Sequence, residues 1–213
     1  MRKIEKRDEP ASLTAFKRRA LNGRYYDLSS LERQDIRIAC TEEQLYLCAY
    51  CCQAISGENS DTINEHIEAQ KLAPNRTLDY TNIVASCRKP NQCDASHGSQ
   101  SLLLTPLMLE CETELRFRMS GRVEGLTDRA RDAIRVLNLG DNENNNKALI
   151  EMRKQMIDSL IWEHYGDDPN NLMLEEDNDV LRLLVDELLL PKAGKLTPFA
   201  PVLANLLRNR IAA

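Results

Sequence analysis

The stretch that decides the fold of this 213-residue chain reads CAYCC at residues 48–52, NEHIE at 64–68, YTNIVASC at 80–87 and CDASHG at 93–98. The fifty residues from 48 to 97 hold five of the seven cysteines and two of the three histidines. Side chains that bind metal ions or transfer protons are therefore concentrated in less than a quarter of the chain.

The cysteines of this stretch have a spacing that fits a metal site. Cys48 and Cys51 form a Cys-x2-Cys pair, and Cys87 and Cys93 follow as a Cys-x5-Cys pair. Four thiolates close a tetrahedral cage of the kind that Zn²⁺ takes in structural sites. The sequence therefore predicts a structural Zn²⁺ site on these four residues, with Cys52 as a possible replacement for Cys51. The other interpretation is that the cysteines are small buried apolar residues.

The residues between the cysteines predict two short strands and a helix. Residues 62–67 contain three β-branched side chains, Thr62, Ile63 and Ile67, which favour a short strand. Residues 71–79 have the composition of a loop, and residues 83–86 form a second apolar run. After the last of these cysteines, Asp94 is placed to cap a helix that carries His97.

In this order the residues resemble the HNH endonuclease motif on a zinc-stapled ββα-metal fold. Glu65, His66 and Ile67 resemble its acidic-histidine-aliphatic first element, Asn82 its middle asparagine and His97 its last histidine. HNH domains commonly end in Cys-x2-Cys-His, whereas the last histidine here lies four residues after the preceding cysteine.

The chemistry of phosphodiester hydrolysis gives each of these residues a role. His66 has an ordinary pKa that lets it take a proton from water near neutral pH. The side-chain carbonyl of Asn82 can accept the other imidazole N–H and so fix the tautomer. Glu65 and His97 can bind Mg²⁺ or Mn²⁺ and leave the other ligand positions to water and phosphate. The resemblance implies the same catalytic set.

The first residues of the chain resemble one subgroup of the HNH family in particular. Residues 1–4 with Pro10 and Leu13 are similar to the PtuB-like subgroup, the nuclease subunits of Septu anti-phage systems, including retron-associated forms. This resemblance implies a metal-dependent endonuclease that cuts DNA or RNA and works with a PtuA-like ATPase. Retron-associated forms add a reverse transcriptase and its RNA and DNA. The alternative is a zinc-stapled module that binds nucleic acid or protein without cleaving it.

The predicted fold class is α+β in three parts. Residues 1–40 are expected to form a basic helical segment, residues 41–105 the zinc-stapled HNH core, and residues 106–213 a mainly helical extension. The helices expected outside the core are 12–21, capped by Ser12 or Thr14, then 31–40 after a capping signal at 29–32, and 126–137, 147–165, 179–190 and 197–211. Residues 166–171 are expected to form a turn.

Charge is distributed unevenly along the chain. Residues 1–37 carry ten Lys or Arg and six Asp or Glu, and Arg24, Tyr25 and Tyr26 place two rings beside a positive charge. Such a group can stack on bases, or it can be a solvated helix face with two core tyrosines. Residues 158–190 carry ten Asp or Glu and one basic residue, Arg182. That acidity repels nucleic acid and indicates a solvated face or a surface for a basic protein partner.

Composition sets the outer limits. The chain is 42% hydrophobic, has no membrane-length apolar run and lacks the apolar core of a signal peptide at its start. We therefore expect a cytoplasmic protein without a membrane contact, in which thiols bind metal or stay free. The net charge of −5 is unfavourable for a nuclease that acts alone, so we expect a partner to assist substrate capture.

Overall fold

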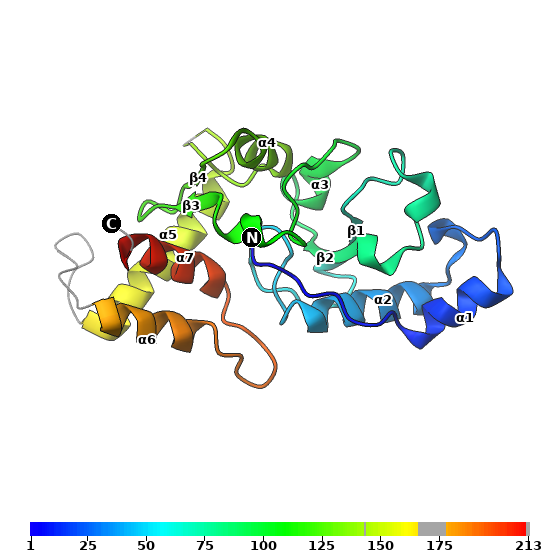
Figure 1. The fold of residues 1–213 in the computed structure, drawn as a ribbon, viewed down its shortest axis with the longest axis horizontal. Coiled ribbons are helices and arrows are strands. Elements are labelled where there is room, and N and C mark those ends of the chain that lie inside the picture. The colour runs from blue at the N-terminus through cyan, green and yellow to red at the C-terminus, as the bar shows by residue number, and fades with distance from the viewer. Residues whose placement is uncertain (143, 166–177, 212–213) are drawn as a thin grey trace.

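The computed structural model describes residues 1–142, 144–165 and 178–211. These residues form a mixed helical and β structure with two small antiparallel sheets. Helix α1 lies at one end of the molecule and α5, α6 and α7 at the other, with β1, β2 and α3 between them and α2 running alongside the β1–β2 hairpin (Figure 1). The helices are α1 (Ala11–Arg19), α2 (Ser30–Glu43), α3 (Asp94–His97), α4 (Asp128–Leu137), α5 (Lys147–Tyr165), α6 (Asn178–Leu188) and α7 (Ala200–Ile211).

The central element is a β hairpin. Strand β1 (Thr62–His66) pairs antiparallel with β2 (Ile83–Cys87), so that Thr62 lies opposite Cys87 and His66 opposite Ile83. Both strands confirm the sequence prediction within one residue. Helix α3 follows after six residues. Asp94 is its first residue and not its cap, because Cys93 occupies the cap position and no side-chain cap bond forms.

Helix α2 covers the hairpin and is capped as the sequence predicts. Ser29 and Glu32 form a reciprocal capping box, which satisfies two backbone N–H groups at the helix start. At the other end, the buried side chain of Gln44 donates to the carbonyls of Leu47 and Ala85, both at 2.8 Å. One amide therefore joins the end of α2, the segment that enters the cysteine cluster, and β2.

The start of the chain differs from the expectation in one respect. Helix α1 begins directly after Pro10, so Ser12 and Thr14 lie inside it and do not cap it. Proline at the cap presets the backbone there without needing a side-chain bond. The basic segment also packs on the core: Lys6 forms a buried ion pair with Glu43 and donates to the carbonyl of Ile83 at 2.8 Å.

The C-terminal half begins with a second hairpin, β3 (Leu115–Phe117) and β4 (Val123–Gly125). The helices expected after it are present, and α4 is capped by Thr127. Helix α6 ends two residues early, and α7 begins three residues late because the chain has a left-handed residue at Phe199. The turn expected at residues 166–171 lies outside the described residues.

One hydrophobic core runs through all three expected parts. It includes Leu13, the cage cysteines, Leu137 and Phe199. The backbone adds direct links, because the N–H of Phe199 donates to the carbonyl of Cys52 at 2.8 Å. The C-terminal region is therefore packed against the cysteine cluster. A smaller core joins α5, α6 and α7.

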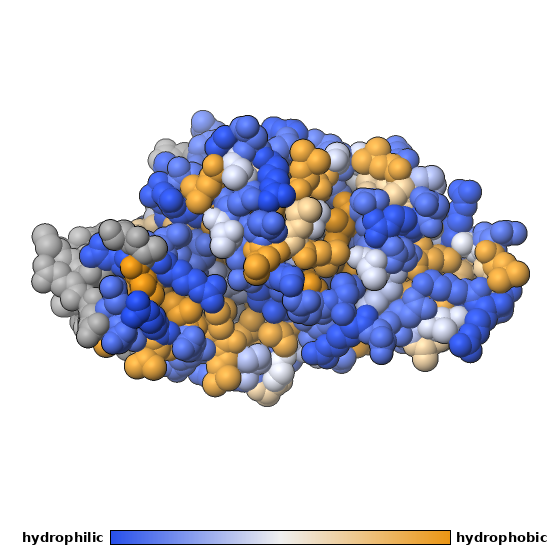
Figure 2. Space-filling view, viewed as in Figure 1, coloured by the Kyte–Doolittle hydropathy of each residue, from blue (hydrophilic) through white to orange (hydrophobic). Residues whose placement is uncertain are grey.

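The surface drawn in Figure 2 is mainly hydrophilic, with apolar patches over the region of α6. That helix exposes Val180 and Leu183, and Leu190 is exposed just after its end. None of the helices in the described ranges has both the length and the apolar content needed to cross a membrane.

Candidate zinc centre and active-site groove

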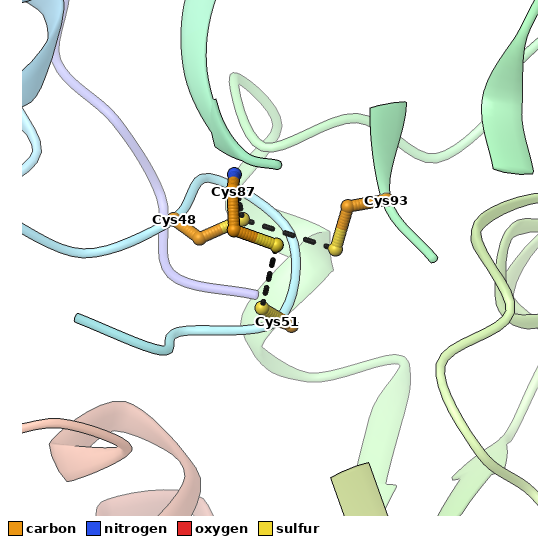
Figure 3. Close-up of side chains that lie close together, drawn as sticks. All are labelled: Cys48, Cys51, Cys87 and Cys93. Carbon is orange, nitrogen blue, oxygen red and sulfur yellow. Dashed lines mark hydrogen bonds between the residues drawn. The ribbon is translucent and has the colours of Figure 1, made fainter. Parts of the chain in front are cut away.

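The four predicted zinc ligands converge on one point. The Sγ atoms of Cys48, Cys51, Cys87 and Cys93 are buried and all lie within 4.8 Å of one another (Figure 3). The Cys48–Cys93 and Cys51–Cys87 Sγ pairs are each 3.8 Å apart. Tetrahedral Zn–S bonds of about 2.3 Å place neighbouring sulfurs about 3.8 Å apart. The cage therefore has the size of a zinc thiolate site.

The surroundings of the cage also fit thiolates. The N–H of Cys87 donates to Sγ of Cys48 at 3.3 Å, and the amide of Gln92 donates to Sγ of Cys87 at 3.4 Å. Oε1 of Gln53 accepts from the same Gln92 amide at 2.8 Å, which fixes its direction. Donors aimed at sulfur stabilise the negative charge of a metal-bound thiolate.

The charges inside the cage favour a cation. Burial acts to raise the pKa of Cys48, but hydrogen bonds with the other three thiols outweigh it and hold that pKa well below its ordinary value. Burial and then the neighbouring thiols raise the pKa of Cys51 and of Cys93 well above theirs. Several thiolates can coexist here only with a bound cation. Cys52 lies outside the group, so Cys51 and not Cys52 is the candidate second ligand.

The predicted metal ligands of the second site, Glu65 and His97, are brought together by β1 and α3. Oε1 of Glu65 lies 2.5 Å from Nδ1 of His97, and the hydroxyl of Tyr50 donates to the same oxygen at 3.3 Å. Nε2 of His97 is buried and has no hydrogen-bond partner in the described part of the chain. The last histidine therefore reaches the first element of the motif despite its unusual spacing.

Asp94 is a site residue that the sequence analysis missed. It lines the same groove as Glu65. Burial, together with a hydrogen bond to Glu65 and the charge of that carboxylate, raises the pKa of Asp94 to about 8. Asp94 and His97 are three residues apart on one helix, a spacing that places two side chains on the same face. Two carboxylates and an imidazole are donors that suit a divalent cation.

His66 is held in a defined tautomer. Its Nε2 lies 2.9 Å from the carbonyl oxygen of Thr77, which can only accept, so Nε2 carries the proton. Nδ1 then carries the lone pair, which accepts a hydrogen bond of 3.3 Å from the amide of Gln70. Burial lowers the pKa of His66, and the Thr77 carbonyl and Glu65 oppose this only in part. The ring is therefore neutral at neutral pH.

Asn82 does not orient His66, so that part of the prediction is wrong. Its Oδ1 accepts from the N–H of Glu68 at 2.8 Å, and its Nδ2 donates to the carbonyl of Glu68 at 3.0 Å. The strand register gives the reason. Because His66 lies opposite Ile83, Asn82 lies level with the residues just beyond the end of β1. Thr77 fixes the ring instead.

The hairpin and the start of α3 border a groove with a volume of about 400 Å³. Glu65, His66 and Asp94 line part of it, and Tyr25 and Tyr26 line another part. Four basic residues complete the wall: Arg33, Arg37, Lys71 and Arg88. The sequence analysis identified none of these four, although Arg33 and Arg37 lie one turn apart on the predicted second helix, a pattern that indicates a basic helix face.

Comparisons with known proteins add no assignment. No protein-family profile matches this chain, and no curated protein matches it. The chemistry open to the groove must therefore follow from its own side chains.

Proposed function

We propose that this protein is a divalent-metal-dependent endonuclease of the HNH type, which hydrolyses phosphodiester bonds of DNA or RNA. One observation carries the proposal. A neutral histidine, whose Nδ1 lone pair accepts only a long hydrogen bond from the Gln70 amide, lies beside a carboxylate–imidazole pair in a groove that also holds four basic residues. General base, cation ligands and phosphate-binding cations are the groups that this reaction requires.

The order of the elements supports the same proposal. A hairpin of β1 and β2 is followed by α3, and Glu65, His66 and His97 all lie on these elements. The cage residues Cys87 and Cys93 lie at the end of β2 and directly before α3. A zinc ion in the cage would thus fix the helix against the hairpin, and with it the separation of the two histidines.

In the proposed reaction, the attacking water displaces the Gln70 amide from Nδ1 of His66, and His66 takes a proton from this water at Nδ1. The carbonyl of Thr77 holds the Nε2–H bond and keeps the ring from rotating. Glu65, Asp94 and His97 would hold Mg²⁺ or Mn²⁺. When bound, such an ion supplies positive charge that stabilises the phosphate and the leaving oxygen. The groove cations bind the neighbouring backbone phosphates.

We further propose that the protein is the nuclease subunit of a cytoplasmic anti-phage complex with a PtuA-like ATPase, which in retron-associated forms includes a reverse transcriptase with its RNA and DNA. Its N-terminal similarity to the PtuB-like subgroup supports this. So does α6, where the exposed Leu183 lies between Asp179 and Asp186 on a surface that does not suit nucleic acid. Four metal-bound thiolates suit the reducing cytoplasm.

One observation favours the alternative of a non-catalytic zinc-stapled module. Glu65 and His97 hydrogen-bond to each other, and within the described residues the cysteines are the only group compact enough to share an ion. In that case the groove would bind nucleic acid or protein and leave it intact.

The deciding experiment is cleavage of matched DNA and RNA panels with Mg²⁺, Mn²⁺ or EDTA, with and without the partner ATPase. We expect metal-dependent products from the wild-type protein and cleavage about 10²- to 10⁴-fold slower from His66→Ala with unchanged zinc content. Intact substrate under every condition, with the zinc-loaded complex assembled, would leave the binding module as the function.

A further inference from the structure

The basic residues of the groove differ from several other arginines of the described chain in lacking an ion pair with a carboxylate. In the described ranges, Arg33, Arg37, Arg88 and Lys71 form no ion pair with a carboxylate. By contrast, eight other arginines do form ion pairs: Arg19, Arg76, Arg118, Arg129, Arg131, Arg135, Arg182 and Arg208. The groove therefore holds four cations that no carboxylate of the described residues contacts directly, although Glu65 and Asp94 line the same groove.

Hydrogen bonds to backbone carbonyls fix the orientation of three of these arginine side chains. Nε of Arg37 donates to the carbonyl of Gly57 at 3.0 Å, and the Arg37 side chain is 92% buried. Arg33 donates to the carbonyl of Tyr26 at 2.7 Å, and its Nε is buried without a partner. Arg88 donates to the carbonyl of Asn59 at 2.7 Å. A carbonyl holds a guanidinium group in place without neutralising its charge. These three guanidinium groups therefore have a fixed orientation and a full positive charge with which to bind an anion such as phosphate.

Two tyrosine rings lead from the groove rim to His66. The ring of Tyr25 meets the His66 ring edge-on at 4.9 Å, and its hydroxyl accepts from Asn64 at 2.9 Å. The ring of Tyr26 lies 6.4 Å from that of Tyr25 and is 73% exposed. Tyr26 thus lines the same groove as His66 with an exposed ring, which can stack on a base of a strand bound there.

We propose that the substrate is nucleic acid with an unpaired nucleotide at the cleavage position. The three arginines hold a backbone phosphate beside the cleaved one, and Tyr26 stacks on the unpaired base. A base within a duplex is already stacked on both faces and cannot use such a ring, whereas bases in single strands and loops can. This inference rests on the proposed function, because it places the nucleotide relative to His66.

The test measures binding without cleavage. The zinc-loaded His66→Ala protein is titrated, by fluorescence anisotropy, into a single strand, a hairpin loop and a full duplex of the same sequence, each as DNA and RNA. We expect the single strand and the loop to bind at least about tenfold more tightly than the duplex. Adding Tyr26→Ala should weaken single-strand binding about tenfold and leave duplex binding unchanged, since stacking is lost. Tyr26→Phe keeps the ring and should bind as its parent does.

Matched controls separate the groove from general charge and aromatic content. Arg88→Gln and Arg37→Gln should each lower the salt dependence of single-strand binding by about 0.7 in log–log slope, because one phosphate contact is lost. Arg37→Lys keeps the buried charge and tests whether folding alone explains the loss. Arg135→Gln, which removes an arginine paired with Asp132, and Trp162→Ala, which removes an exposed ring on α5, should change neither value.

Equal affinity for duplex and single strand, or unchanged binding by Tyr26→Ala, would overturn the inference. That result is distinguishable from failure of the proposed function. A wild-type protein that binds single strands through Tyr26 and never cleaves would refute only the nuclease proposal. A protein that cleaves duplex as fast as single strand would refute only the unpaired nucleotide.

Discussion

The cysteine cage and the groove lie on the same hairpin but differ in how their polar groups are satisfied. In the cage, four identical ligands are buried and surround a single point. In the groove, carboxylates, histidines and arginines of different chemistry line an open space. The two sites are adjacent in the chain, since Cys87 ends β2 and Cys93 directly precedes Asp94.

This difference separates a structural task from a chemical one. A closed site with no open ligand position can only hold elements together. An open site that gathers cations and a neutral histidine contributes little to the stability of the fold. The same groups can bind a charged substrate and transfer a proton. If the division is correct, variants of the cage should fail in folding, and variants of the groove should fail in chemistry while they fold normally.

The largest expected effect is that of breaking the cage. Cys87→Ser should abolish zinc binding and destabilise the fold by more than about 4 kcal/mol, because the metal contributes folding free energy directly. Elemental analysis and denaturant unfolding measure the two quantities. Cys52→Ser is the matched control, since Cys52 is equally buried but outside the cage, and it should keep one zinc per chain. Full zinc content in Cys87→Ser would show that this cysteine is not a ligand.

The next effect tests the groove alone. His66→Ala should lower the cleavage rate about 10²- to 10⁴-fold, the usual cost of losing a general base. Zinc content and unfolding midpoint should stay close to those of the wild type, because the ring lies outside the cage. Single-turnover cleavage with saturating metal measures the rate. Loss of zinc together with activity would instead mean that His66 supports the fold and that the division between the sites is wrong.

A smaller effect separates the cation ligands from the base. Glu65→Ala and His97→Ala should raise the metal concentration needed for half-maximal cleavage about 10- to 100-fold, a typical cost of weakening a metal site. High Mg²⁺ or added Mn²⁺ should restore part of the rate. His66→Ala provides the contrast, since extra metal cannot replace a proton acceptor. Equal rescue of all three variants would argue against distinct roles.

The smallest effect concerns Asn82. Asn82→Ala removes two hydrogen bonds to the backbone of Glu68 and should cost about 1–3 kcal/mol of stability. Cleavage should fall far less than in His66→Ala, because Thr77 and not Asn82 holds the ring. Thermal unfolding and cleavage rate are compared on one preparation. A rate loss as large as that of His66→Ala would return Asn82 to the catalytic set.

Local signals in the sequence were sufficient for several features. Ser29 and Glu32 predicted the start of α2, because a capping box involves only residues three apart. The β-branched residues within 62–67 predicted β1, and cysteine spacing predicted the cage. The aromatic pair at 25–26 left two roles open, and the structure divides them: Tyr25 is half-buried against His66, whereas Tyr26 is exposed.

Other features depend on contacts between distant residues. Packing places Cys51 and not Cys52 in the cysteine cluster, and it brings His97 into contact with Glu65. Packing also orients the groove arginines, through the carbonyls of Gly57, Tyr26 and Asn59. The sequence by itself determined which residue types are available and where the strands and most helices form, because these depend on neighbours along the chain. Only the tertiary structure decided which oxygen faces His66, because a strand register and a folded loop bring Thr77 to the ring and leave Asn82 beyond its reach.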